Sequence, residues 1–217
     1  MNHRVISFDF DGVIVNQVNS WGLIREILGI PEGRIKSYIK GTINGKQFRD
    51  SEHILFKQYN LRYEHFIQAG KQEQFHPNVK ETIEESFHKG YILLINSAGP
   101  RPIILTVLRR FQPSTFKYIF SMIPLFDINN YFYDTYLPFE DDNYDMDKVK
   151  VLELVAKREN IPVESIIHVG DGFTDISCFK KCIGVSFNSH NQKVIQSAQY
   201  NLENFKDLIP LIQKLNE

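Results

Sequence analysis

Two aspartates stand two residues apart in the segment Phe8-Asp9-Phe10-Asp11-Gly12, at the point where the apolar stretch Arg4–Phe8 ends. In extended backbone, side chains two residues apart point the same way, so both carboxylates can face one pocket. In open α/β sheets, ligands bind at the carboxyl ends of the strands. A carboxylate pair at such an edge can divide the chemistry, because one acid attacks or holds a metal while the other moves protons.

An acidic pair of the same spacing recurs at Asp145 and Asp147, but no apolar strand leads into it. Chance alone predicts about one such pair in a chain of ordinary composition. Aspartate also favours turns and helix N-termini. We therefore interpret this second copy as a solvated loop or the start of a helix.

A further acidic segment, Gly170-Asp171-Gly172-Phe173-Thr174-Asp175, follows the apolar run Ile166–Val169. Its glycines permit a tight turn and close approach of a ligand, which leaves Asp171 at a strand end and Asp175 at the start of a helix. Alone, the segment is equally typical of a Gly-Asp-Gly turn with a helix N-cap. Acids gathered at two strand ends repel each other unless a cation lies among them, so the pattern favours a bound metal.

Two weaker signals complete the set. Ser97-Ala98-Gly99 follows the apolar strand ending at Asn96 and precedes a helix, where a hydroxyl and backbone N–H groups can bind an anion. Ser-Ala-Gly is also an ordinary loop sequence. Lys148 begins the helix before the Asp171 strand, but a lysine there usually faces solvent, and Lys150 competes for the same role.

Composition limits the classes of protein that need to be considered. The chain has 217 residues, of which 42% are hydrophobic and 24% charged, enough for one large domain or a domain with an insert. Its net charge of -1 gives no electrostatic footprint for nucleic acid or an anionic membrane. No apolar run is long enough for a membrane span and no apolar signal region precedes the first strand, so we expect a cytoplasmic protein. Cys178 and Cys182 lack the partners of a metal site and are interpreted as small hydrophobes.

Short β-rich apolar runs alternate with helical patterns, which predicts an α/β fold with a Rossmann-like parallel sheet and helices on both faces. The expected strands are Val5–Phe8, Tyr91–Asn96, Tyr118–Met122, Ser165–Val169 and Ile183–Phe187. The expected helices are Val79–Lys89, Ile103–Phe111, Asp147–Glu159, Asp175–Lys181 and Phe205–Leu215.

The stretch between the first two strands is too long for one crossover helix. From Asn19 to about Gln74 it has a helical pattern throughout. Apolar residues recur near the 3.6 period at Trp21, Ile24, Leu28, Ile35, Ile39, Ile54, Leu55 and Tyr59. Breaks between helices are expected at Gly29, Pro31, Gly41, Gly45 and Gly70. We therefore expect residues 1–15 and 77–217 to form the core, and residues 16–76 to form a small helical cap above the Asp9 strand end.

Taken in order, Asp9–Gly12, Ser97, Lys148 and Gly170–Asp175 resemble the four motifs of the haloacid dehalogenase (HAD) superfamily. The resemblance covers nearly the whole chain, including a helical cap after the first strand. The sequence looks most like the phosphoserine phosphatase subgroup, whose lysine spacing favours Lys148 over Lys150. Dehalogenation is not expected, because it needs no metal and no acid two residues after the nucleophile, whereas Asp11 is present.

The resemblance implies a role for each matched residue. Asp9 would be the nucleophile that forms an aspartyl phosphate, and Asp11 would protonate the leaving oxygen and then activate water. Mg²⁺ would bridge Asp9, the main-chain carbonyl of Asp11, Asp171 and the phosphoryl group. The charge on the phosphoryl group would be stabilised by Ser97, the amides of Ala98 and Gly99, and Lys148. Asp175 would orient Lys148 or a metal-bound water.

The substrate is the least determined property. Phosphoserine phosphatases resemble each other in a glutamate and a cap arginine that hold the substrate's amino and carboxylate groups, and the corresponding places here fall near Val18 and His53. Neither residue can do the same job. We therefore expect a Mg²⁺-dependent phosphatase for some other small phosphorylated metabolite, with phosphoserine phosphatase as the alternative. A phosphotransferase and a non-catalytic binding protein on the same fold are further alternatives.

One aromatic cluster looks exposed, and it consists of Tyr131, Phe132, Tyr133, Tyr136 and Phe139. We interpret it as a β-hairpin flap packed on the core, with a dimer contact as the alternative. Both a monomer and a homodimer are therefore open at this point.

Overall fold

The computed structural model describes residues 4–17, 19–31, 43–142 and 144–217. Within these residues seven strands form one sheet, in the order β4-β3-β2-β1-β5-β6-β7. The strands are β1 (Val5–Phe8), β2 (Ile92–Pro100), β3 (Phe116–Phe126), β4 (Phe132–Tyr136), β5 (Ile167–Gly170), β6 (Ile183–Phe187) and β7 (Tyr200–Leu202). All neighbours are parallel except β3 and β4, which form an antiparallel hairpin.

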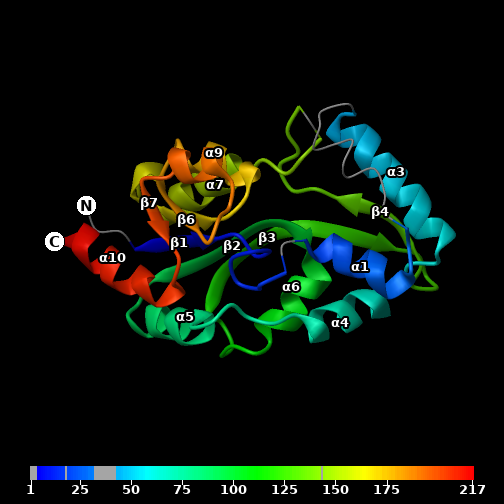
Figure 1. Ribbon diagram of the computed structural model, residues 1–217, viewed down its shortest axis with the longest axis horizontal. Helices are drawn as coiled ribbons and strands as arrows, with labels where there is room; N and C mark the ends of the chain where they lie inside the picture. The colour runs from blue at the N-terminus through cyan, green and yellow to red at the C-terminus, as the bar shows by residue number, and fades with distance from the viewer. Residues whose placement is uncertain (1–3, 18, 32–42, 143) are drawn as a thin grey trace.

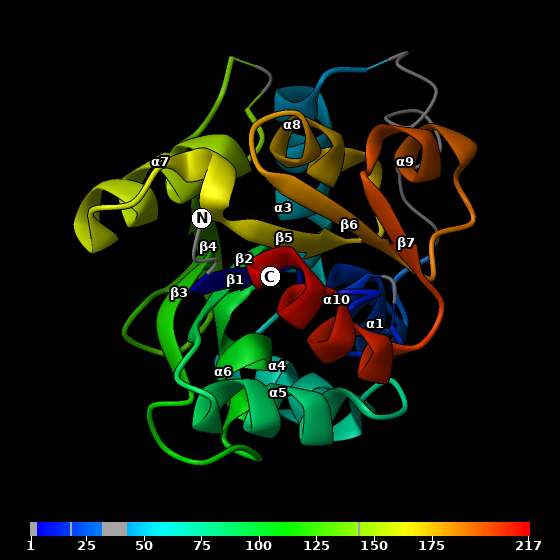
Figure 2. The same ribbon diagram turned by 90° about the vertical axis from the view of Figure 1, so that its left-hand side faces the viewer.

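Helices cover both faces of the sheet (Figures 1 and 2). One layer contains α5 (Val79–His88), α6 (Arg101–Leu108) and α10 (Leu208–Asn216). The opposite layer contains α7 (Lys148–Glu159), α8 (Ile176–Phe179) and α9 (Gln192–Ser197). This arrangement confirms the predicted α/β fold with a parallel sheet. No helix in the described ranges is long and apolar enough to cross a membrane.

The central strand β1 lies between β2 and β5, and the strand order reverses direction there. In register, Phe8 at the end of β1 pairs with Ile95 of β2 and Val169 of β5. Ligands bind in α/β sheets outside the carboxyl ends of the strands at such a reversal. The residues that follow Phe8, Ile95 and Val169 therefore lie side by side, although they are far apart in the sequence.

The helical insert lies beyond the carboxyl ends of the strands, next to the β3–β4 hairpin (Figure 1). Its described helices are α1 (Ser20–Leu28), α3 (Gly45–Gln58) and α4 (Tyr63–Gln72). Trp21 of α1 stacks on Phe56 of α3 at 5.5 Å between ring centroids, and Phe56 meets Phe132 of β4 edge to face at 5.8 Å. One continuous hydrophobic cluster thus joins the insert to the sheet.

Several element boundaries differ from the sequence predictions. β2 continues beyond the predicted end at Asn96 through Ser97–Gly99, expected as a loop, because β3 pairs with it as far as Pro100. β3 is longer than expected because it continues into the hairpin, where Phe132 is buried while Tyr133 and Tyr136 are exposed. The predicted Asp175–Lys181 helix is a 3-10 turn followed by the four-residue α8. The short elements α9 and β7 were not predicted.

Two expectations for the insert were wrong. Ile54, expected on the buried face of α3, is 58% exposed, because α3 turns Glu52 and Phe56 inward. Gly70 does not break a helix but lies buried inside α4. The expected positions Ile35, Ile39 and Gly41 lie outside the described residues.

Gly70 is the point of close approach between α4 and α6. A Cβ atom added there would lie 2.6 Å from Thr106 Cβ and 3.1 Å from the carbonyl oxygen of Ile103. We predict that Gly70→Ala lowers the free energy of unfolding by about 1–3 kcal/mol, as overpacking does elsewhere. Urea unfolding followed by circular dichroism measures the change.

Gly22→Ala is the matched control, because Gly22 is also helical and a Cβ there would meet nothing closer than 3.4 Å. This substitution should be neutral or stabilise the protein by up to about 1 kcal/mol through helix propensity. Equal effects of the two substitutions would show that α4 and α6 are less closely packed than described here.

Candidate active site

Asp9 directly follows β1, and both of its carboxylate oxygens are occupied. Its own N–H donates to the carbonyl of Val169 at 2.9 Å, which ties the residue to β5. Oδ1 accepts from the Phe10 N–H at 2.7 Å, and Oδ2 accepts from Lys148 Nζ at 2.6 Å. Asp9 is 7% exposed, so this carboxylate is fixed in one orientation at the end of the central strand.

Lys148 is the first residue of α7 and points into the protein. Its ammonium contacts Asp9 at 2.6 Å and Asp175 at 2.7 Å, and its side chain is 2% exposed. Burial opposes the charge, but Asp175 and Asp9 outweigh burial and raise the pKa of Lys148, so it stays protonated. Lys150, two residues further along the helix, is 53% exposed and lies 3.3 Å from Asp147, the N-cap of α7.

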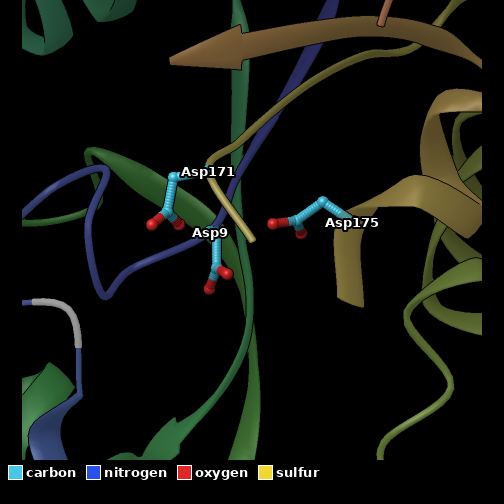
Figure 3. A group of neighbouring side chains, drawn as sticks. All are labelled: Asp9, Asp171 and Asp175. Carbon is cyan, nitrogen blue, oxygen red and sulfur yellow. The ribbon is translucent and has the colours of Figure 1, made fainter. Parts of the chain in front are cut away.

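Asp171 and Asp175 reach the same place from the loop after β5. One oxygen of each, together with one of Asp9, lies within 4.8 Å of the other two (Figure 3). Two glycines make room for this approach. A Cβ on Gly170 would lie 2.3 Å from Asp175 Cγ, and a Cβ on Gly12 would lie 2.2 Å from Asp171 Oδ2.

The three carboxylates differ in what already satisfies them. Asp175 Oδ1 accepts from Lys148, and Oδ2 accepts from the Gly172 N–H at 3.1 Å. Although burial acts against it, Lys148 holds the pKa of Asp175 well below the ordinary value. Asp171 has no hydrogen-bond donor on its carboxylate within the described part of the chain, and burial, then the charges of Asp9 and Asp175, raise its pKa to about 8.

This donor set suits a hard divalent cation. Carboxylate oxygens are the ligands that Mg²⁺ prefers, and a cation would relieve the repulsion between Asp171 and its acidic neighbours. Asp171 is the carboxylate whose negative charge has no donor or cation beside it in the described residues, and Asp9 lies next to it, whereas Asp175 already accepts from Lys148 and from the Gly172 N–H.

Asp11 is held by the insert. The Ser20 N–H at the start of α1 donates to Asp11 Oδ2 at 2.9 Å, and the Ser20 hydroxyl donates to Oδ1. Burial raises the pKa of Asp11 to about 7, even though both Ser20 hydrogen bonds lower it. The Ser20 hydroxyl also lies 3.4 Å from a carboxylate oxygen of the buried Glu73. Burial, and after it the charge of Asp11, raises the pKa of Glu73 to about 7.

Ser20 and Glu73 were missed by the sequence reasoning. The signal for Ser20 was its place beside Asn19, the side chain that caps α1, directly above the Asp9 strand end. A helix start at that point brings backbone N–H groups toward Asp11. Nothing local indicated Glu73.

Ser97 lies in the irregular end of β2 and is buried. Its Oγ accepts from the Gly99 N–H at 3.0 Å, so this amide, expected to face a phosphoryl group, is engaged by Ser97. A Cβ on Gly99 would lie 3.3 Å from Ser97 Oγ and 3.6 Å from Asp11 Oδ2, which places the turn against the acid pair. The indole N–H of Trp21 donates to the Ala98 carbonyl at 3.4 Å, so α1 covers this turn.

Asn96 was also missed. Its Nδ2 donates to the main-chain carbonyl of Lys148 at 2.9 Å, which ties the end of β2 to the start of α7. The residue is buried, and its Oδ1 has no partner within the described ranges. An amide directly after a buried apolar strand was the available signal.

Val18 and His53 are the two insert positions that the sequence analysis compared with the substrate-binding residues of phosphoserine phosphatases. Val18 lies outside the described residues. His53 turns toward the hairpin, with Nε2 3.2 Å from Thr135 Oγ1 and its ring edge-on to Phe132. Arg25 of α1 and Glu52 of α3 form a partly buried ion pair with each other.

An open groove of about 770 Å³ reaches the site from the side of Asp171 and Gly12. Its walls are polar, with His76 and the segment 188–192 facing it. Asp9 and Lys148 are buried and do not line this groove. Cys178 and Cys182 are free and buried, and they take no part in the acidic cluster.

Comparison with known proteins places the chain in a family. A profile of the haloacid dehalogenase-like hydrolase family matches residues 6–180. A phosphoserine phosphatase of Methanocaldococcus jannaschii is 29% identical over 182 residues, which are 82% of each chain.

Solved structures share the fold. Phosphoserine phosphatase in apo form is 24% identical and superimposes with a TM-score of 0.76 over 97% of this chain and 98% of its own. A phospho-aspartyl intermediate analogue of phosphoserine phosphatase has a TM-score of 0.77 at 24% identity, over 99% of both chains. A HAD family hydrolase from Salmonella enterica serovar Typhi has a TM-score of 0.81 at 20% identity, over 96% of this chain and 70% of its own.

The repulsion around Asp171 predicts that this residue destabilises the metal-free protein. Because its folded pKa is raised, to about 8, the native state binds its proton more tightly than the unfolded state, and stability is lost as pH rises toward that value. In EDTA at pH 8, Asp171→Asn should therefore raise the free energy of unfolding by at least about 1 kcal/mol, or about 2–4 °C in Tm. The gain should shrink toward pH 4.

Asp142→Asn, at an exposed aspartate, is the control and should leave Tm unchanged at both pH values. Mg²⁺ should raise the Tm of the wild type more than that of Asp171→Asn. A wild type that is as stable as the variant in EDTA at pH 8 would contradict the unrelieved repulsion.

Proposed function

The chain belongs to the haloacid dehalogenase-like hydrolase family, and we propose that it is a Mg²⁺-dependent phosphatase acting on a small phosphorylated metabolite through an aspartyl phosphate. The resemblance to this family that the sequence indicated is confirmed by the matching profile and the phosphoserine phosphatase relative, and the roles of the residues in the four motifs stay predictions. The observation that carries the proposal is the buried Asp9 carboxylate, 2.6 Å from a lysine ammonium and beside the unrelieved carboxylate of Asp171.

In the proposed first step, a carboxylate oxygen of Asp9 attacks phosphorus and forms a P–O bond while the bond to the substrate's leaving oxygen breaks. Asp11 gives its proton to that oxygen. Water then attacks the aspartyl phosphate, Asp11 takes a proton from it, and the bond to Asp9 breaks to release phosphate. A pKa of about 7 for Asp11, caused by its burial, suits a group that must both give and take a proton near neutral pH.

The remaining residues act on charge and position. Lys148 and the Ser97 hydroxyl would stabilise negative charge on the transferring phosphoryl group. Asp9, the main-chain carbonyl of Asp11 and Asp171 would hold Mg²⁺, which when bound neutralises phosphoryl charge. Asp175 would orient Lys148, consistent with the 2.7 Å contact between them. The Gly99 amide would be available to the phosphoryl group only after leaving Ser97.

Substrate choice is assigned to the helical insert, residues 16–76, acting as a cap. Trp21 covers the Ala98 carbonyl and stacks on Phe56, which gives this side of the site an aromatic wall. A small metabolite held between that wall and Asp9 would leave its phosphoryl group against Lys148.

The two buried free cysteines are consistent with the cytoplasmic location expected from the sequence.

Phosphoserine phosphatase is the second candidate, because the curated relative with 29% identity has that activity. Against it, His53 contacts Thr135 and Arg25 is paired with Glu52, so neither is free to hold a substrate carboxylate in the described arrangement. A panel of phosphorylated metabolites separates the two: phosphoserine as the best substrate would favour the second candidate.

Asp9→Asn should abolish Mg²⁺-dependent release of phosphate from a generic aryl phosphate, because an amide of nearly the same shape cannot attack phosphorus. The wild type assayed with Mg²⁺ and with EDTA provides the reference, and circular dichroism checks that the variant is folded. Turnover by Asp9→Asn comparable to that of the wild type would overturn the nucleophile assignment.

Lys148 and Lys150 provide a matched pair on one helix. Two residues along a helix turn the side chain by about 200°, so the two lysines face different surroundings. Lys148→Ala should lower kcat at least about tenfold, a loss of about 1.4 kcal/mol of transition-state stabilisation. Lys150→Ala should have little effect, as expected for an exposed lysine. The reverse pattern in steady-state kinetics would show that the charge acting on the phosphoryl group comes from elsewhere.

A further inference from the structure

A buried row of polar side chains continues behind Asp175, away from the substrate side. His168 of β5 lies with Nε2 2.9 Å from Asp175 Oδ1 and Nδ1 2.9 Å from Ser7 Oγ. Ser7 and His168 are register partners across β1 and β5, so their side chains meet directly. Ser7, His168 and Asp175 are all fully buried. The reaction steps proposed above make no use of Ser7 or His168.

The direction of these hydrogen bonds follows from their acceptor. An ionised Asp175 carboxylate only accepts, so Nε2 of His168 must carry the hydrogen. In the neutral ring Nδ1 is then an acceptor, and the Ser7 hydroxyl is the donor that faces it. The Asp175 carboxylate therefore sets the ring tautomer, and the Ser7 hydroxyl holds the ring in place by donating to Nδ1.

Asp175 Oδ1 receives two donors, the His168 N–H and the Lys148 ammonium. The same ammonium is shared with Asp9, at 2.6 Å against 2.7 Å for Asp175. A buried carboxylate that loses one donor draws more strongly on the donors that remain. Without His168, Asp175 would therefore pull Lys148 toward itself and away from Asp9.

We infer that His168, oriented by Ser7, is a positioning residue for the phosphatase reaction: its Nε2–H satisfies Asp175 and so keeps the Lys148 ammonium beside Asp9. The inference rests on the proposed function for its kinetic consequence only. Ser7 of β1 is also two residues before Asp9, which directly follows the strand, so the nucleophile and the last member of this row point to the same side.

Two amide side chains test the inference as a matched pair. In His168→Gln the amide nitrogen reaches about as far as Nε2 and can donate to Asp175, whereas in His168→Asn it reaches about as far as Nδ1 and serves only Ser7. We expect His168→Asn to lower kcat about tenfold or more with KM changed less than about twofold, and His168→Gln to stay within about threefold of the wild type.

Ser7→Ala should lower kcat by less than His168→Asn, and should add little in the double variant, because both changes act on the same hydrogen bond. Ser86→Ala is the control, since Ser86 is a buried serine whose hydroxyl donates to the Thr82 carbonyl within α5, outside this row. It should leave kcat unchanged. Thermal unfolding of every variant separates loss of turnover from loss of folding.

Equal kcat for the Asn and Gln variants, or a loss confined to KM, would overturn the inference. Should His168→Asn fail to fold, Ser7→Ala decides alone, and an unchanged kcat in that variant overturns it as well. Crystal structures of the two His168 variants add a readout that needs no turnover: the Lys148 Nζ to Asp9 distance should lengthen in His168→Asn and not in His168→Gln. A wild type that releases no phosphate while this displacement is seen would refute the proposed function and keep the positioning role.

Discussion

A buried ammonium shared by two carboxylates is the interaction on which the rest of this site depends. Lys148 lies between Asp9 and Asp175 with almost no exposure to solvent, and removing this ammonium would leave two buried carboxylates without their shared counter-charge, at a cost of about 3–5 kcal/mol. The three groups come from β1, from the loop after β5 and from the first residue of α7. The two ion pairs of Lys148 therefore hold these three elements together. Asn96 of β2 adds a hydrogen bond to the main-chain carbonyl of Lys148.

The parallel sheet makes such a meeting possible without long loops. The strands β2, β1 and β5 end at one edge, and each end delivers its polar residues within a few positions of the last paired residue. Glycine at two of these positions allows carboxylates to approach where a Cβ would collide. The same closeness leaves Asp171 repelled by its acidic neighbours, an unfavourable interaction that a bound cation would relieve.

The core of the site could be predicted from the sequence because its geometry is local to strand ends. β1 and β6 were predicted to the residue, and the acids that follow β1 and β5 do meet. Contacts set by packing between distant segments were not predictable: Ser20 reaches Asp11 only because the insert folds back, and Ile54 is exposed because Phe56 faces Trp21 instead. Short polar elements such as β7 and α9 carry too little periodicity to be recognised, and a glycine such as Gly70 can serve close helix packing as well as a break.

The contact between Ser20 and Asp11 matters for anyone exchanging parts between relatives. By sequence, the natural junction for grafting a foreign cap falls just after the first strand and its turn, before residue 20. The structure puts both donors to the Asp11 carboxylate on the far side of that junction, on the first residue of α1. A chimera cut there would carry the aspartates of one parent and the hydrogen bonds of another. Recombination that preserves the hydrogen bonds to Asp11 must therefore cross over beyond Ser20, inside the helix and not at its border.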